Sequence, residues 1–210
     1  MKVALRSAAE APNVRNNQEM LSRDEAIGLL AEYGSGAAWT GHCLAVAHAA
    51  VQVGSALEAF RAVELDSLWS TALLHDIGRY ASHDPIIHGV EGYNLLVRLG
   101  HQDAAFVCAS HVLFGLDASE AVRFGLPARD FVPQTYEERI VPLVDFLIEG
   151  DRPTTLDNRF FSLRQRNVGN GLFLERLDRA QEAAASFMMQ LSAEIGEPVE
   201  TIVASCPWCS

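Results

Sequence analysis

Apolar residues recur at helical spacing along most of the chain. The first such stripe runs from Ala26 to Tyr33, directly after Ser22 and Glu25, which have the spacing of a capping box. Gly34 follows the stripe, and glycine commonly ends a helix. This pattern predicts a helix that begins after Ser22 and ends at Gly34.

The same spacing predicts further helices, and no segment alternates with period two for long enough to indicate a strand. Thr135 and Glu138 form a second capping box, and the helix that they open contains Pro142, which should kink it and shift Asp145. The fold class is therefore predicted to be all-α, a helical bundle. The expected helices cover residues 40–53, 57–75 with a break before 65, 88–99, 101–114, 118–124, 135–148 and 170–195.

A chain of 210 residues is long enough for one well-buried domain with small extensions. We expect a loose leader over residues 1–20, a principal domain over 21–165 and a helical extension over 166–210. The extension ends in a tail that contains Cys206 and Cys209. Neither a redox nor a zinc role is expected for this pair, because a zinc site needs two further ligands and a redox site needs a helix start.

The charge of the chain limits its partners. The formal net charge is −11, which disfavours binding to long nucleic acid, since that requires a basic face. Lys2 is the only lysine, so an anionic group in the interior must be bound by arginine, backbone N–H groups or a metal. No stretch approaches the ~18 apolar residues of a membrane span, and no apolar segment follows the basic start. We therefore expect a cytoplasmic protein without a membrane partner.

Histidine and aspartate interrupt several of the apolar helices. The clearest case is "ALLHDIGR", in which an apolar helix meets His75 and Asp76. Neutral imidazole and carboxylate are the groups that bind Zn, Mn, Fe or Co near pH 7, and side chains on separate helices can converge in a bundle core. Adjacent residues on a helix point about 100° apart, so this pair should grip an ion from its side. The candidate ligands are His42, His75, Asp76, His88, His111 and Asp145.

Five segments together resemble the HD superfamily of metal-dependent phosphohydrolases. They are "GHCLAVA", "LLHDIGR", "IIHGVEGYNLLVRLG", "ASHVLFG" and "VPLVDFLIEG", and the resemblance covers roughly residues 24–160. It is strongest to a branch of single-domain prokaryotic proteins, and it implies that the principal domain over 21–165 is an HD domain. It also implies a core metal site of His42, His75, Asp76 and Asp145, and a second metal at His88 and His111, with Asp76 bridging the two ions.

The resemblance also suggests residues that act on the substrate. Arg79 lies where some relatives have a basic residue that contacts phosphate, so Asp76 and Arg79 are the predicted catalytic residues. His83 lies in the loop after the HD pair, which borders the pocket in relatives, and is a second candidate for substrate binding. His48 faces away from His42 on the same helix and is expected to pack or lie at the surface. The arginines at 159, 164 and 166 follow the last ligand; we expect them on a solvated face, with a position over the pocket as the alternative.

The sequence therefore predicts hydrolysis of a phosphoester or phosphoanhydride of a small molecule, with a nucleotide favoured, by a metal-activated hydroxide. The cofactor is expected to be two divalent ions, with Fe, Mn, Co or Ni favoured and Zn allowed. Two alternatives stay open. The same six ligands occur in HD-type di-iron oxygenases, and a metal- or nucleotide-sensing module without turnover would also keep them. The substrate and a homo-oligomeric state are not determined by the sequence.

Overall fold

The computed structural model describes residues 20–208. Within that range the chain forms ten α-helices, two short 3-10 helices and a two-stranded antiparallel hairpin, which confirms the all-α class. The predicted leader lies almost wholly outside the described residues, as does Cys209. No helix of the described part is both long and apolar enough to cross a bilayer.

Local signals located several helix ends correctly. Ser22 caps α1 through the predicted capping box with Glu25, and Thr135 caps α7 in the same way with Glu138. Gly100 ends α4 in the left-handed conformation that glycine adopts without strain. The helices are α1 Arg23–Gly34, α2 Trp39–Leu57, α3 Leu65–Leu74, α4 Ile87–Leu99, α5 Gln102–Ser110, α6 Ala118–Arg123, α7 Tyr136–Phe146, α8 Leu156–Arg166, α9 Gly171–Ile195 and α10 Val199–Ala204.

Other boundaries differ from the prediction. The expected helix over 101–114 ends at Ser110 and continues as the 3-10 helix η2, Val112–Phe114, in which Leu113 and Phe114 have φ values of 50° and 61°. Such values are unfavourable for residues with a Cβ atom, and no sequence pattern indicates them. A second 3-10 helix, η1, covers Ile77–Tyr80. Helix α8 and helix α10 were not predicted, nor was the small hairpin of β1, Ile148–Glu149, and β2, Arg152–Pro153.

Helix α7 continues without a break through Pro142. Proline has no N–H, so the backbone hydrogen bond that residue 142 would donate to the carbonyl of Glu138 is missing, but the helix continues past it. Asp145, on the same helix, reaches the cluster of histidines described below. The predicted displacement of Asp145 is therefore wrong.

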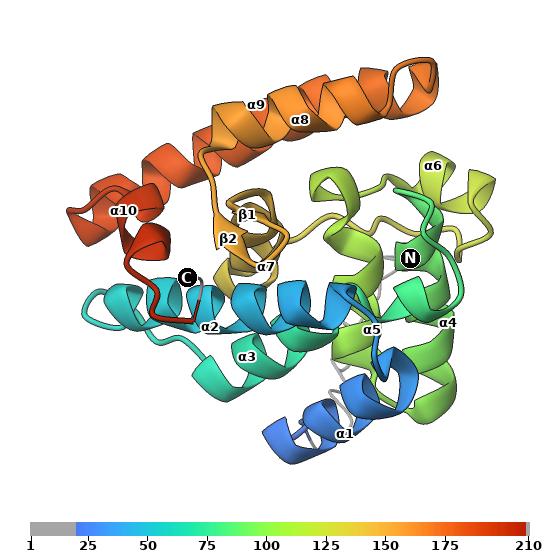
Figure 1. The fold of residues 1–210 in the computed structure, drawn as a ribbon, viewed down its shortest axis with the longest axis horizontal. Helices are drawn as coiled ribbons and strands as arrows, with labels where there is room; N and C mark the ends of the chain where they lie inside the picture. The colour runs from blue at the N-terminus through green and yellow to red at the C-terminus, as the bar shows by residue number, and fades with distance from the viewer. Residues whose placement is uncertain (1–19, 209–210) are drawn as a thin grey trace, which may run out of the picture.

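The elements pack as a bundle around α7 (Figure 1). Helices α2 and α3 pack against each other and against α7, and α4 packs on α5 and η1. The α8 and α9 pair lies side by side across one edge of the molecule, and α9 also contacts α7 and η2. The buried positions of α9 form a stripe at helical spacing: Phe173, Leu177, Ala180, Ala184, Phe187 and Leu191.

Candidate metal centre

The adjacent residues His75 and Asp76 face one cluster because the helix ends just before them. Helix α3 ends at Leu74, His75 is its C-cap, and Asp76 has φ −102° and ψ 10°, outside the helical region. The chain then turns into η1. His75 Nε2 lies 3.8 Å from Asp76 Oδ2, so the two side chains point toward the same space. The two side chains thus converge because the chain turns here, and not from adjacent positions on a continuous helix.

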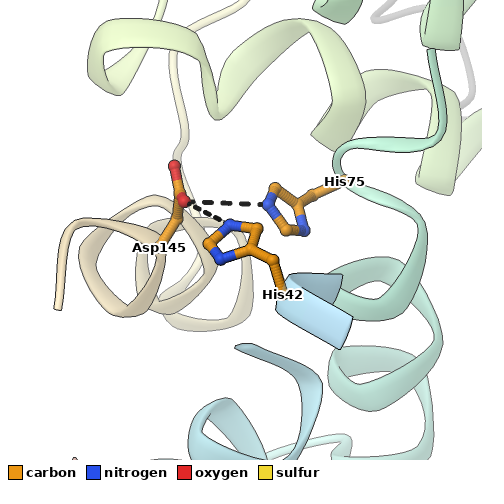
Figure 2. A group of neighbouring side chains, drawn as sticks. All are labelled: His42, His75 and Asp145. Atoms are coloured by element: carbon orange, nitrogen blue, oxygen red, sulfur yellow. Dashed lines mark hydrogen bonds and ion pairs between the residues drawn. The ribbon is translucent and has the colours of Figure 1, made fainter. Parts of the chain in front are cut away.

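One group of ligand atoms comes from three helices that are distant in the sequence. His42 lies on α2, His75 follows α3, and Asp145 lies on α7 (Figure 2). Asp145 Oδ1 is 2.9 Å from His42 Nε2 and 3.8 Å from His75 Nε2. Asp76 Oδ2 is 3.9 Å from His42 Nε2. These spacings are those of donor atoms gathered around a common point, and the three residues of Figure 2 could hold a metal ion.

A second group surrounds the other oxygen of Asp76. Asp76 Oδ1 lies 3.0 Å from His88 Nε2 and 3.6 Å from His111 Nε2. His88 is in the first turn of α4, and His111 is the C-cap of α5. The two oxygens of Asp76 thus face different pairs of histidines. The structure brings together all six side chains that the sequence proposed as ligands.

The ring orientation of each histidine is set by the main chain. The Nδ1 atoms lie 2.7 Å from the carbonyl of Gly150 for His42, 2.7 Å from that of Ala72 for His75, 2.8 Å from that of Asp84 for His88 and 3.3 Å from that of Val107 for His111. A carbonyl only accepts hydrogen bonds, so each Nδ1 must donate. In the neutral ring this leaves the lone pair on Nε2, and all four Nε2 atoms point at the carboxylates.

Lone pairs that face each other require a cation. His88 Nε2 and His111 Nε2 are 3.1 Å apart, and His42 Nε2 is 2.9 Å from a carboxylate oxygen. A proton or a metal ion between such atoms relieves the repulsion, and histidine held by a carbonyl at its other nitrogen is a common metal ligand. His75 Nε2 is buried and has no hydrogen-bond partner among the described residues. The donor set therefore fits a divalent metal ion.

The electrostatics of the cluster keep both carboxylates charged. Burial alone would raise the pKa of Asp76, but the charges of His88 and His75 outweigh it and hold that pKa well below its usual range. Burial likewise opposes ionisation of Asp145, but the neighbouring His42 and His75 outweigh it and lower the pKa of Asp145 well below normal. Burial lowers the pKa of the His75 imidazole, which favours its neutral form, whereas Asp145 and Asp76 outweigh burial at His42 and raise its pKa. Charged carboxylate and neutral imidazole are the forms that bind metal.

A cleft opens beside the cluster. His88, His111 and Asp145 form its polar floor. Arg79 lines it from η1 and donates from Nε to Asp76 Oδ2. Arg159 lines it from α8, with a side chain that is 12% exposed. The prediction that Arg159 belongs to a solvated face is therefore wrong, because α8, which was not predicted, turns this side chain into the cleft.

The remaining candidates lie elsewhere. His83 is exposed and is not among the described residues that line the cleft. His48 stacks on Trp208 with ring centroids 4.5 Å apart, away from the cluster, as expected of a packing residue. Arg164 binds Asp178 and Arg166 binds Glu149, both as partly exposed ion pairs. The thiols of Cys43, Cys108 and Cys206 are free and buried.

Comparison with known protein families agrees with this arrangement. The HD domain matches residues 39–147, which is just over half of the chain and contains all six clustered residues. The chain belongs to the HD domain family. HD domains are metal-dependent hydrolases at the level of the superfamily, and the histidine and aspartate clusters could hold the metal. The match ends before α8, so Arg159 lies outside the HD domain that it faces.

Three known proteins are similar to this chain in sequence. An uncharacterized protein of Methanocaldococcus jannaschii is 34% identical over 138 residues, which cover 65% of this chain and 81% of that protein. A tRNA (cytidine(56)-2'-O)-methyltransferase of Thermoplasma volcanium is 30% identical over 194 residues, which cover 91% of this chain and 53% of the methyltransferase. A methyltransferase of the same name from Picrophilus torridus is 35% identical over 98 residues, or 46% of this chain and 28% of that protein. No solved structure matches the chain.

Proposed function

We propose that this HD protein is a metal-dependent phosphohydrolase that cleaves a phosphoester or phosphoanhydride of a small molecule. The observation that carries the proposal is a single cleft. It is lined both by candidate metal ligands and by two arginines: His88, His111, Asp145, Arg79 and Arg159. Metal ligands beside two guanidinium groups suit a phosphate group, which is anionic and accepts hydrogen bonds on every free oxygen.

We propose that two ions bind. One would be held by His42, His75, Asp145 and Oδ2 of Asp76, and the other by His88, His111 and Oδ1 of Asp76, according to the distances between these atoms. Ions at such sites, of which Fe, Mn, Co, Ni and Zn are candidates, activate water for attack and neutralise charge on phosphoryl oxygens. The histidines contribute by presenting Nε2 lone pairs in fixed directions, which spares the reorganisation of a flexible site.

Arg79 is the proposed catalytic cation. Its side chain is 27% exposed and is anchored through Nε on Asp76, which leaves the Nη atoms to bind a ligand in the cleft. Burial opposes the charge, but Asp76 and Asp145 raise the pKa of Arg79 above its normal value and keep it protonated. A fixed positive charge at this place stabilises the negative charge that builds on the phosphoryl oxygens in the transition state. His83 lies in the loop after η1 and is a second candidate for substrate binding.

A small substrate is favoured over a polymeric one. The chain has a formal net charge of −11, which disfavours binding to a long polyanion. A nucleotide is the class that the resemblance to the family suggests. The name of the methyltransferase relatives refers to tRNA, but this chain spans about half or less of those proteins. We propose a cytoplasmic enzyme, and a homo-oligomer is compatible with the proposal.

The two arginines favour this proposal over the oxygenase, and turnover separates it from a sensor. A di-iron oxygenase could use the same six ligands, and a sensor would bind metal and ligand without turnover. An oxygenase substrate need not be a phosphate, whereas the paired guanidinium groups favour an anionic group at the metals. This observation favours the phosphohydrolase.

The test is phosphate release from nucleotides, dinucleoside polyphosphates and sugar phosphates, with Mn, Fe, Co or Ni supplied. We expect wild-type protein to release phosphate and Asp76→Ala to lose that activity by at least about 1,000-fold, because both proposed ions depend on this carboxylate. Asp66→Ala, in an exposed ion pair with Arg23, is the matched control and should be fully active. Oxygen consumption by an iron-loaded protein that releases no phosphate would favour the oxygenase instead.

A further inference from the structure

The Arg159 side chain is buried beside the cleft but has few partners. Its Nε atom is buried and makes no hydrogen bond to any described residue. Its Nη atoms lie 3.9 Å from Asp145 Oδ1 and 3.7 Å from Glu149 Oε1, which is too far for direct hydrogen bonds. A guanidinium has five N–H groups, and leaving them unpaired in a buried place costs free energy. Arg159 therefore has donors to offer to a ligand.

The surroundings of Arg159 hold it in place without using those donors. Glu149, on β1, accepts hydrogen bonds of 2.7 Å from Ser162 and 2.9 Å from Arg166, both on α8. The carboxylate is thus tied to the same helix that carries Arg159, and it lies on one side of the guanidinium while Asp145 lies on the other. This arrangement keeps the charge at the mouth of the metal centre.

The wall next to Arg159 is apolar. Leu163, one turn further along α8, and Phe173, at the start of α9, line the cleft together with Leu113 and Phe146. Leu113 reaches it from a left-handed backbone conformation, which strongly held surroundings must impose. Among the described residues that line the cleft, no serine, threonine, asparagine or glutamine is present to bind sugar hydroxyls.

We propose that the α8–α9 pair selects the substrate of the HD domain: Arg159 binds the phosphate of a phosphomonoester, and Leu163 and Phe173 bind an apolar or aromatic organic group attached to it. The proposal rests on the phosphohydrolase function and names its substrate class. Arg79 and Arg159 together supply two positive charges for a group that carries nearly two negative charges at neutral pH, as a terminal phosphate does. A diester carries one. The segment that makes the choice lies outside the family match.

The test uses binding of non-hydrolysable phosphonates to the full chain loaded with Mn, measured by calorimetry. Wild-type protein should bind phenylphosphonate more tightly than methylphosphonate. Arg159→Gln should weaken the binding of both by about 10- to 100-fold, the range for a lost hydrogen bond to a charged group. Arg159→Lys keeps the charge but not the planar fork, and should give an intermediate loss. Arg164→Gln removes an arginine from the exposed side of the same helix and should change nothing.

Leu163→Ser tests the apolar wall separately. It should weaken phenylphosphonate by about threefold or more and leave methylphosphonate unchanged, since only the ring covers this surface. Metal content and thermal unfolding of every variant are measured alongside, so that a loss of ions or of folding is recognised. Unchanged phosphonate affinity in both Arg159 variants, or no phosphonate binding by wild type, would overturn the inference. Phosphonate binding that depends on Arg159 in a protein that hydrolyses no phosphate ester would refute the phosphohydrolase and leave this binding site supported.

Discussion

At the scale of single residues, Asp76 joins the two halves of the cluster. One of its oxygens lies 3.0 Å from His88 Nε2, and the other lies 3.8 Å from His75 Nε2. A carboxylate shared in this way contributes to two sites at once, whereas each histidine contributes to one. Substitutions of aspartate and histidine should therefore have different effects on the number of ions bound.

We predict that His111→Gln lowers the bound metal from about two ions per chain to about one, because it removes a ligand from only one of the proposed sites. Asp76→Asn should lower the content of both sites, since the amide has lost the negative charge. Elemental analysis after dialysis against metal-free buffer measures the stoichiometry. The prediction fails if wild-type protein holds a single ion, or if both variants lose metal equally.

At the scale of elements, the approach of η1 to α4 depends on glycine. A Cβ atom on Gly78 would lie 1.9 Å from the carbonyl oxygen of His88 and 2.3 Å from the backbone nitrogen of Gly92. Both are main-chain atoms and cannot rotate away. The glycine that follows the His-Asp pair thus lets the backbone carrying Asp76 and Arg79 sit directly against the helix that carries His88.

Gly78→Ala is therefore expected to lower the free energy of unfolding by about 3 kcal/mol, the upper part of the usual range for overpacking, and to weaken metal binding. Gly28→Ala is the matched control, because Gly28 is exposed in α1 and a Cβ there would meet nothing within 4 Å. It should raise stability by about 0.5–1 kcal/mol through helix propensity. Urea unfolding of the two variants measures the difference, and equal stabilities would contradict the packing argument.

The elements that local signals define were predictable, and those that tertiary contacts define were not. Capping boxes placed the starts of α1 and α7 because the bonds involved span three residues. Helix α8 was missed although Thr155 caps it through Asn158, since only Leu156 and Phe160 of its residues are buried and its apolar stripe is short. A Thr-x-x-Asn pattern before Phe160 and Leu163 was the available signal.

The six clustered residues were found from the sequence because they are chemically unusual for apolar helices. Their separation into two groups around Asp76 follows from the chain turning after Leu74, which periodicity does not show. The setting of Arg159 was missed for a related reason. Whether an arginine faces solvent or a cleft depends on which helix lies beneath it, and that is a tertiary property.

At the scale of the whole molecule, the candidate metal centre lies within a large hydrophobic core. In some small domains, by contrast, a metal site takes the place of such a core. Phe131, Phe160 and Phe187 are fully buried in parts of the bundle outside the cluster. A chain with this much apolar burial does not need metal to fold, in contrast to small zinc domains. Metal should act as a ligand that stabilises a fold already formed.

Chelation is accordingly predicted to leave the helical circular dichroism unchanged while lowering the melting temperature. Free metal at 100 times its Kd adds about 2.7 kcal/mol, which for a chain of this length corresponds to about 5–11 °C. Melting curves with and without Mn measure the shift. Asp76→Ala should melt at one temperature in both conditions, and loss of helix on chelation alone would contradict the prediction.

The four carbonyls that orient the histidines have a consequence for how the protein can change. They belong to the main chain of the hairpin turn, of α3, of the loop before α4 and of α5, and a main-chain carbonyl is present whatever side chain a residue carries. In many metal sites an outer carboxylate does this work, and a single mutation there disturbs the metal. Here the groups that orient the histidines are backbone carbonyls, which a side-chain substitution does not remove. We expect substitutions around the centre that leave the backbone path unchanged to preserve metal binding, which leaves the cleft free to diversify toward new ligands.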